Sequence, residues 1–211
     1  MKIEFVSDVA CPWCAIGLNA LERALDSIGD DIAVELSFQP FELNPDMGPE
    51  GEDTIAYLSA KYGRTAEQIR QTQAMIRERG AAVGFVFGAR DRVWNTFDAH
   101  RLLCWAEGQG EGRQRALKHA LLQGYHGEGR NPGDREVLLD LAGRVGLDVA
   151  AARAVLDGDA YTEEVRERER FWQSAGIHSV PAIVIDRKHL ISGGQPPEVF
   201  EQALRRIAAG G

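Results

Sequence analysis

Two cysteines separated by two residues, in the segment Cys11-Pro12-Trp13-Cys14, carry the clearest chemical signal in this sequence. A C-x-x-C dithiol can close into a small disulfide. Here it lies between a short apolar run and a helical pattern, in a chain whose start does not look like a secretory signal. In that setting we expect the pair to cycle between the dithiol and the disulfide.

The two cysteines are expected to play different parts. Cys11 lies at the predicted N-terminus of a helix, where unpaired backbone N–H groups and the positive end of the helix dipole favour a thiolate. Pro12 suits the first helical turn because it has no N–H to leave unpaired. Cys14 lies one turn deeper and should be less exposed. Cys11 would therefore exchange with a substrate through a mixed disulfide, and Cys14 would resolve it.

The elements that must position this dithiol follow from the periodicity of the chain. A helix follows the dithiol as far as Ile28, and Pro197 opens a last helix. The block from about residue 54 to residue 175 is mostly helical, with one helix predicted over residues 114–125. The order is βαβ, a long helical block and then ββα, which predicts an α/β fold with one small sheet. The strands are predicted at residues 2–6, 32–38, 182–185 and 189–192.

A second candidate segment, Val180-Pro181, comes just before the third predicted strand. A proline there cannot donate to a strand ladder, and a cis X-Pro bond would suit a tight turn. The Val180 backbone would then be free to pair with an extended substrate segment. We therefore take Pro12, Trp13, Val180 and Pro181 as the candidate substrate-binding residues.

Five segments in order along the chain strengthen this interpretation: residues 7–17, 40–47, 95–102, 176–182 and 192–196. Their sequences are SDVACPWCAIG, PFELNPDM, NT with AHRL, GI with SVPA, and SGGQP. Together they resemble the DsbA-like branch of the thioredoxin superfamily, and more closely its cytoplasmic FrnE-type group. The resemblance implies thiol–disulfide oxidoreductase activity, with Cys11 and Cys14 as the catalytic pair and Pro181 as a cis-proline facing them.

The same resemblance predicts a DsbA-like thioredoxin fold with a large all-helical insertion. Residues 1–44 and 176–211 would form the thioredoxin-fold domain, and residues 45–175 the insertion. Related 2-hydroxychromene-2-carboxylate isomerases and kappa-class glutathione transferases have a serine-type position where Cys11 stands, and they bind glutathione. A glutathione-dependent isomerase or transferase is therefore one alternative function, and a chaperone-like peptide-binding module is a second.

Trp13 stands where the periplasmic DsbA-like enzymes typically have a histidine between the cysteines. An imidazolium would stabilise a neighbouring thiolate, and an indole cannot. We therefore predict a weaker oxidant than DsbA, whose potential is about −120 mV.

The charge and hydropathy of the sequence limit the kinds of partner that we expect for this protein. The 211 residues carry a formal net charge of −8, which argues against a nucleic-acid surface. No apolar run approaches the roughly 18 residues of a membrane span, and the N-terminus does not look like a signal peptide, so we expect a cytoplasmic protein. We expect protein or peptide thiols and disulfides as substrates. Glutathione or a thioredoxin-type reductant stays open as a partner, as does the choice between monomer and homodimer.

Three cysteines are too few for a disulfide framework, and His178 and His189 are too isolated to complete a zinc site, so we expect no metal and no bound organic cofactor. Cys104, among apolar neighbours, is predicted to be a small core residue. Glu4 could relay the proton of Cys14 or could reach water at a strand end. The remaining polar residues of the family-like segments are interpreted as turn, cap and structural residues: Asn44, Asn95 and His100.

Overall fold

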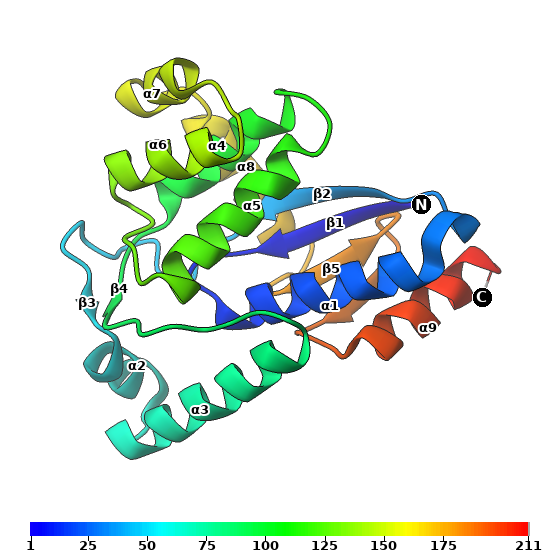
Figure 1. The fold of residues 1–211 in the computed structure, drawn as a ribbon, viewed down its shortest axis with the longest axis horizontal. Helices are drawn as coiled ribbons and strands as arrows, with labels where there is room; N and C mark the ends of the chain where they lie inside the picture. The colour runs from blue at the N-terminus through cyan, green and yellow to red at the C-terminus, as the bar shows by residue number, and fades with distance from the viewer. Residues whose placement is uncertain (211) are drawn as a thin grey trace.

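The computed structural model describes residues 1–210, and its centre is a four-stranded sheet with the strand order β2-β1-β5-β6 (Figure 1). Strand β1 pairs in parallel with β2 and antiparallel with β5, and β5 pairs antiparallel with β6. The predicted order βαβ…ββα is therefore confirmed. The strands are β1 (Lys2–Ser7), β2 (Glu35–Pro40), β5 (Ala182–Ile185) and β6 (His189–Ser192).

The chain between β2 and β5 is mostly helical, as predicted, and most of these helices gather beyond the β2 edge of the sheet. Two features were not expected: a short hairpin of β3 (Glu52–Asp53) with β4 (Arg92–Val93), and a π-helical turn η2 (Gln123–Gly127). The helices of this block are α2 (Thr54–Tyr62), α3 (Ala66–Ala82), α4 (Phe97–Glu107), α5 (Arg113–Leu122), α6 (Arg135–Arg144), α7 (Val149–Asp157) and α8 (Thr162–Ser174).

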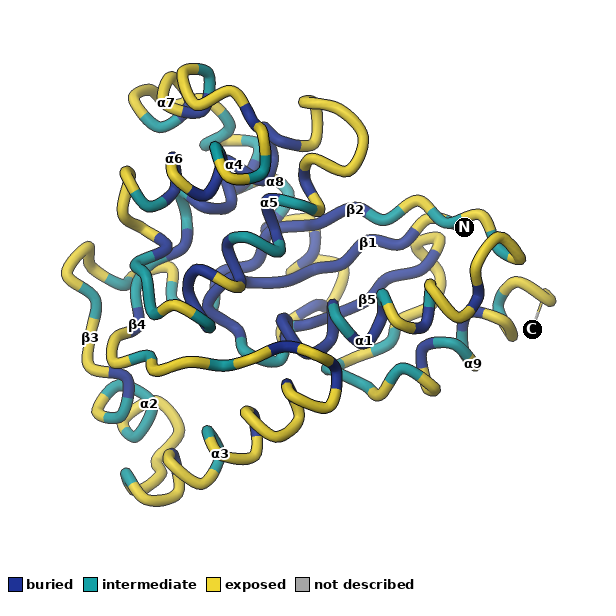
Figure 2. Tube along the Cα trace, in the orientation of Figure 1, coloured by how far each residue is buried: buried dark blue, intermediate teal, exposed yellow. Residues whose placement is uncertain are grey.

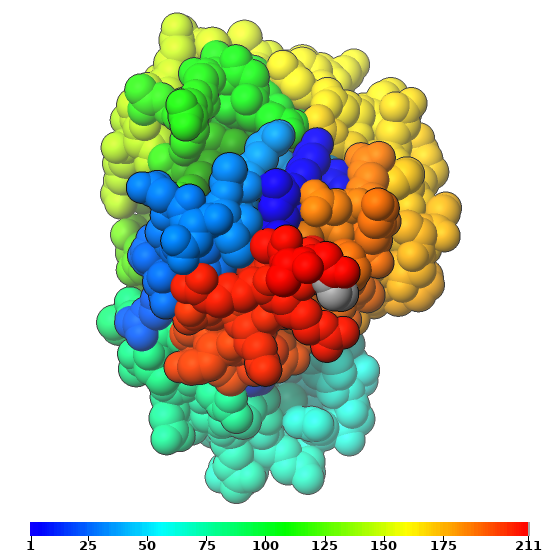
Figure 3. All heavy atoms as spheres, turned by 90° about the vertical axis from the view of Figure 1, so that its right-hand side faces the viewer, coloured from blue at the N-terminus to red at the C-terminus, as the bar shows by residue number. Residues whose placement is uncertain are grey.

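One face of the sheet is covered by α1 (Pro12–Ile28) and α9 (Pro197–Ala208), which pack against each other. Figure 3 shows this contact end on, with α9 in red beside the end of α1 in blue. A short 3-10 turn, η1 (Gly29–Asp31), ends α1. The side chains of Ile3 and Phe5 join this core, which also holds Cys14. The core therefore reaches from the far end of α1 to its first turn.

The opposite face of the sheet packs on α8. Val6 and Val184 join Trp172 of α8 in a separate cluster. Because successive strand side chains point to opposite faces, β1 sends Ile3 and Phe5 towards α1 and sends Glu4 and Val6 towards α8. Figure 2 shows the central strands buried along most of their length, whereas α3 is largely exposed.

Two predicted boundaries were wrong. The second strand begins at Glu35 rather than at Ile32, because its first ladder contact is the Glu35 N–H donating to the Met1 carbonyl at 3.0 Å. Ile32 and Val34 pack against the core without joining the ladder. The single helix predicted over residues 114–125 is α5 followed by the π-helical turn.

Candidate active site

The first turn of α1 presents the two cysteines differently. Cys11 is the N-cap residue, in an extended conformation, and Pro12 is the first helical residue. The Cys11 N–H donates to the Asp8 carbonyl at 3.3 Å, and the Cys14 N–H donates to the Cys11 carbonyl at 3.1 Å. These bonds fix the turn that places Cys11 at the start of α1, where this residue is 4% exposed. The two cysteines are not joined by a disulfide in the structure.

A cleft of about 560 Å³ opens in front of Cys11. Cys11, Pro12, Trp13 and Val180 all line it, whereas Cys14 does not, and Cys14 has no exposed surface. The Cys11 thiol donates a weak hydrogen bond to the Val180 carbonyl, with an Sγ–O distance of 3.5 Å. The sulfur that faces the cleft is therefore that of Cys11, with Cys14 behind it.

Burial has the largest effect on the pKa of the Cys14 thiol. Loss of solvent, followed by the neighbouring Cys11 thiol, raises the pKa of Cys14 well above its ordinary value. The charge of Lys118 acts in the opposite direction. Cys14 is therefore a thiol at neutral pH unless something nearby takes its proton.

The Val180–Pro181 peptide bond is cis, and Pro181 is buried behind Val180 rather than lining the cleft. Two glycines let this loop approach α1 closely. A Cβ on Gly17 would lie 3.1 Å from Pro181 Cγ and 3.3 Å from the Cα of Gly194. A side chain at Gly17 would push the loop and the dithiol helix apart.

A buried carboxylate supports the turn before Cys11. Asp8 Oδ1 accepts hydrogen bonds from the Ala10 N–H at 3.1 Å and the Thr96 hydroxyl at 2.7 Å, and it lies 3.3 Å from His100 Nε2. Its Oδ2 accepts from the Leu43 N–H at 2.7 Å. Burial acts to raise the pKa of Asp8, but these partners, His100 first, hold it below its usual value. Asp8 thus joins β1, α4 and the segment after β2 at one point.

His126, in the π-helical turn, supports the same backbone from the other side. Its Nε2 lies 2.8 Å from the Val9 carbonyl, and its Nδ1 lies 3.2 Å from an Arg90 guanidinium nitrogen. Burial, and then the charge of Arg90, lowers the pKa of His126 well below its ordinary value. The ring is therefore neutral, with Nε2 donating to Val9 and Nδ1 accepting from Arg90. Neither His126 nor Arg90 belongs to a motif that could be recognised in the sequence.

The cleft wall opposite the dithiol comes from α2 and α3 and is apolar with cationic groups. Leu58, Tyr62 and Ile69 supply apolar surface, and Lys61 and Arg64 supply positive charge, with Arg90 nearby. Among the side chains of residues 1–210 that line this cleft there is no Asp or Glu. A cleft that lacks carboxylates is notable in a chain of 32 acidic and 24 basic residues.

The structure also assigns places to the residues whose roles the sequence left open. Asn44 lines the cleft and accepts hydrogen bonds from Tyr57 and Lys61, both at 2.7 Å. Asn95 Oδ1 accepts from the Phe97 N–H at 2.8 Å, so it does cap α4 from one residue before the N-cap. His100 is the satisfied structural histidine that was predicted.

Cys104 is a core residue, as predicted. It is 4% exposed, and burial raises the pKa of its thiol to about 12. A thiol with that pKa is protonated at neutral pH and is a poor nucleophile.

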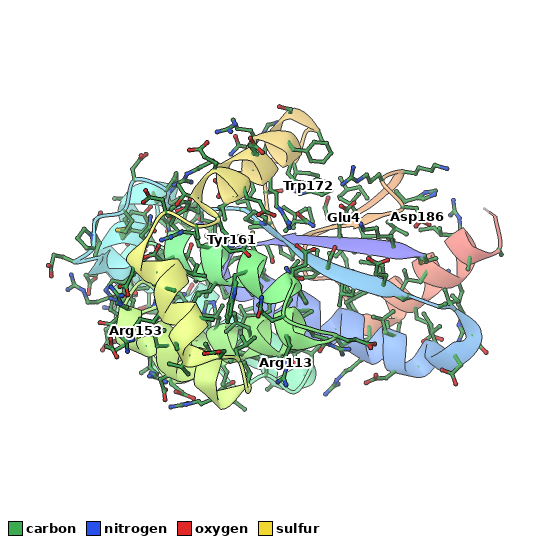
Figure 4. The ribbon with its side chains drawn as sticks, turned by 90° about the horizontal axis from the view of Figure 1, so that it is seen from above. Glu4, Arg113, Arg153, Tyr161, Trp172 and Asp186 are labelled. Carbon is green, nitrogen blue, oxygen red and sulfur yellow. The ribbon has the colours of Figure 1, made fainter. Side chains whose placement is uncertain are left out.

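The hypothesis that Glu4 relays the proton of Cys14 is wrong. Both Glu4 oxygens accept from the Arg187 guanidinium, at 3.0 and 3.1 Å. In Figure 4, Glu4 lies between α8, which carries Trp172, and the β5–β6 turn, which carries Asp186. Cys14 lies in the core on the other face of the sheet, so the strand itself separates the two groups.

Comparison with known proteins identifies the family. A model of the DSBA-like thioredoxin domain matches residues 2–205. The chain belongs to this DSBA-like family. Another similar protein is YwbO of Bacillus subtilis (strain 168), named as uncharacterized, which is 29% identical over 211 residues covering 97% of this chain and 96% of YwbO.

Solved structures agree with this DSBA-like assignment. A probable DsbA oxidoreductase from Streptomyces coelicolor is 39% identical, with a TM-score of 0.91 over 98% of this chain and 89% of that one. The cytosolic disulfide reductase DsbM from Pseudomonas aeruginosa, solved with GSH, is 17% identical, with a TM-score of 0.69 over 99% of this chain and all (100%) of that one. The fold is therefore a DsbA-like thioredoxin fold. Within residues 1–210, no helix has the length and apolar character needed to cross a membrane.

Proposed function

We propose that this protein is a thiol–disulfide oxidoreductase in which Cys11 exchanges with substrate and Cys14 resolves the mixed disulfide. The observation that carries the proposal is the difference between the two thiols. Cys11 lines the cleft, whereas Cys14 is wholly buried one turn behind it. A substrate sulfur can reach the first, and the second can then displace that substrate by attacking Cys11.

The backbone beside the dithiol suits an extended substrate. Val180 lies in the cleft wall next to the Cys11 thiol, and its carbonyl already accepts from that thiol. A peptide lying along this loop would bring its own cysteine over Cys11, while Trp13 and Tyr62 supply apolar surface in the same cleft. Protein or peptide disulfides are therefore the proposed principal substrates.

The deciding experiment equilibrates the protein in glutathione redox buffers and traps the thiols by alkylation. We expect a reversible two-electron transition in the wild type and in Cys104→Ser, with no transition in Cys11→Ser or Cys14→Ser. Cys14→Ser should instead accumulate a mixed disulfide at Cys11. We expect the midpoint to lie below the roughly −120 mV of DsbA. The absence of any transition in the wild type would contradict the proposed function.

Glutathione is proposed as a co-substrate because the cleft offers cations to an anionic thiol. Lys61 and Arg64 donate only to neutral oxygens of the protein, and Arg90 forms no ion pair with a carboxylate in the described residues. We expect Arg64→Gln to raise the KM for glutathione disulfide about three- to tenfold, the range expected on losing one exposed or partly desolvated charge contact. Arg170→Gln, which changes an exposed arginine of α8 outside the cleft, is the matched control. Equal KM values would remove glutathione from the proposal.

Loss of Cys11 also separates the alternatives. A glutathione-dependent isomerase would retain turnover of a hydroxychromene-type substrate in Cys11→Ala. A chaperone-like module would suppress aggregation equally well in Cys11→Ser. The oxidoreductase proposed here loses insulin reduction in both variants.

A further inference from the structure

Lys118 on α5 is a buried basic side chain that the exchange reaction described above does not use. It has no exposed surface, and its Nζ has no hydrogen-bond partner within residues 1–210. Transferring an unpaired ammonium group out of water is strongly unfavourable, and such a group tends to lose its proton instead. Burying Lys118 without a hydrogen-bond partner therefore costs free energy of folding.

The position of Lys118 is fixed by the packing of α5 on β2. One helical turn earlier, Gln114 accepts from the Phe38 N–H at 3.0 Å and donates to the Phe38 carbonyl at 3.2 Å. Residues four apart share a helix face, so Lys118 points into the same interface. There it lines a small closed space with Pro40, His100 and Cys104, among others.

The titratable and charged groups around Lys118 come from four elements. They are Cys14 and Cys11 at the start of α1, Asp8 at the end of β1, His100 and Cys104 on α4, and His126 in the π-helical turn. Three of these already have partners: His100 with Asp8, Asp8 with four donors, and His126 with Val9. Cys104 has a thiol pKa of about 12. Cys11 exchanges with substrate, so Cys14 is the group that still needs a proton acceptor.

Lys118 and Cys14 influence each other in opposite directions. Burial lowers the pKa of Lys118, and Cys14 is the first of the charges that raise it again. Burial raises the pKa of Cys14, and Lys118 is the first group that lowers it. Neither group has exposed surface, and Phe38, which lines the same space as Lys118, also packs in the core that holds Cys14. In such a site a buried amine can take the proton of a buried thiol. Glu4 cannot do this because it lies across the sheet, paired with Arg187.

We propose that Lys118 is a positioning residue that holds the proton of Cys14 while Cys14 acts as a thiolate. The proposal rests on the function proposed above. When Cys11 is in a mixed disulfide, the Cys14 thiol gives its proton to the Lys118 amine, and the thiolate attacks Cys11 Sγ. The bond from Cys11 to the substrate sulfur breaks, and the substrate leaves as a thiolate that takes a proton from water. Overall the dithiol is oxidised to a disulfide and the substrate disulfide is reduced to two thiols.

The reverse reaction uses the same proton. A substrate thiolate attacks Cys11 Sγ, the Cys11–Cys14 bond breaks, and Cys14 leaves as a thiolate. Lys118, as the ammonium, returns the proton to Cys14. Lys118 would therefore act in both directions of the cycle.

The test follows two releases of thionitrobenzoate from Ellman's disulfide after rapid mixing with reduced protein, over a range of pH. The first release reports attack by Cys11, and the second reports resolution by Cys14. In Lys118→Met we expect an unchanged first release and a second release slowed by about tenfold to a hundredfold at neutral pH, within the range for loss of a proton-transfer group. The second release should recover towards the wild-type rate at high pH. Lys188→Met, an exposed lysine in the β5–β6 turn, is the matched control.

The outcomes separate the two proposals. A second release with the wild-type rate and pH profile in Lys118→Met overturns the role of Lys118. Failure of the first release in the wild type overturns the proposed function instead. If Lys118→Met does not fold, NMR titration of the Lys118 side chain in the wild type and in Cys14→Ala decides the question. Loss of the thiol should move that titration to lower pH, and an unmoved titration overturns the proposal.

Discussion

The buried carboxylate of Glu4 and the buried amino group of Lys118 lie in the same small protein but in opposite circumstances. Glu4 is 2% exposed, and both its oxygens are held by the Arg187 guanidinium, which reaches water. Lys118 is fully buried and its Nζ has no such partner within residues 1–210. A carboxylate that is paired in this way is a structural group, because its charge is compensated in every state of the protein.

The contrast shows where this fold can do proton chemistry. Around Cys14 the polar groups are held so that Asp8 stays ionised and His126 stays neutral, each through named partners. The Cys14–Lys118 pair is the one to which we assign a change of protonation during the reaction. The region beneath α8 holds a charge that is paired, and the region beside α1 holds the thiol and the amine of that proposal.

The largest effect is expected at Asp8. Asp8→Ala leaves buried donors without an acceptor, so we expect the free energy of unfolding to fall by about 3–5 kcal/mol. Since the pKa of Asp8 is held below the 3.8 of a free side chain, this contribution is present above that pH and is lost as the pH falls through the folded-state value. Urea unfolding at several pH values measures both, with the exposed Asp30→Ala as control. A loss equal to that of Asp30→Ala would show that the network is not structural.

Glu4→Gln should affect stability alone. It weakens a bidentate charge-assisted contact, so we expect a loss of about 1.5–3 kcal/mol in the free energy of unfolding. The redox midpoint of Cys11–Cys14 should be that of the wild type, because the sheet separates Glu4 from Cys14. Urea unfolding and the glutathione titration test the two parts, with the exposed Glu35→Gln as control. A shifted midpoint in Glu4→Gln would break the comparison between the two regions.

His126 should make stability depend on pH. Its pKa is lowered in the folded protein, so below its ordinary value of 6.5 the unfolded chain binds a proton that the folded one does not. Stability should therefore fall as the pH falls below 6.5, by up to about 1.4 kcal/mol per pH unit from this group. His126→Gln keeps a donor for Val9 and does not titrate, so its stability curve should be flatter. Parallel curves for the two proteins would contradict the assignment of a neutral ring.

The smallest effect is expected at Cys104. Cys104→Ala should cost about 1 kcal/mol in the free energy of unfolding and leave disulfide exchange unchanged. Because the thiol pKa is about 12, iodoacetamide should not modify Cys104 in the native protein near neutral pH. Peptide mass mapping after alkylation measures this. Modification of Cys104 at a rate like that of Cys11 would show that its environment is not the closed core described here.

Much of the fold could be predicted because the residues that begin and end its helices and strands are recognisable in the local sequence. The apolar run at residues 182–185 lies between Pro181 and the polar turn at Asp186, and it forms β5 with those bounds. The start of β2 could not be predicted, since Ile32 and Val34 are as apolar as strand residues but take no part in the ladder. Hydrophobic periodicity indicates which residues are buried. A strand also needs backbone hydrogen bonds to a neighbouring strand, and the periodicity does not show these.

In the candidate site, residues that form a motif with their sequence neighbours could be predicted. Residues that come together only through folding, such as His126 and Lys118, could not. The C-x-x-C segment and Val180-Pro181 each carry their own local pattern. Lys118 had a weak signal, because it occupies an apolar-face position of α5, between Leu117 and Leu121. For Glu4, the alternation of side chains along β1 is a sequence signal that already places it on the face opposite Phe5.

The close approach of Gly17 to Pro181 has a consequence for biosynthesis. Strand β1 and α1 leave the ribosome early and can pack with β2, but β5 and the loop that packs on Gly17 come more than 150 residues later. Until that last segment docks, the Cys11–Cys14 turn lacks its contact with the Val180–Pro181 loop. The nascent chain therefore carries an uncovered dithiol for most of its synthesis, and a prematurely terminated chain would keep that dithiol without the Val180–Pro181 loop beside it.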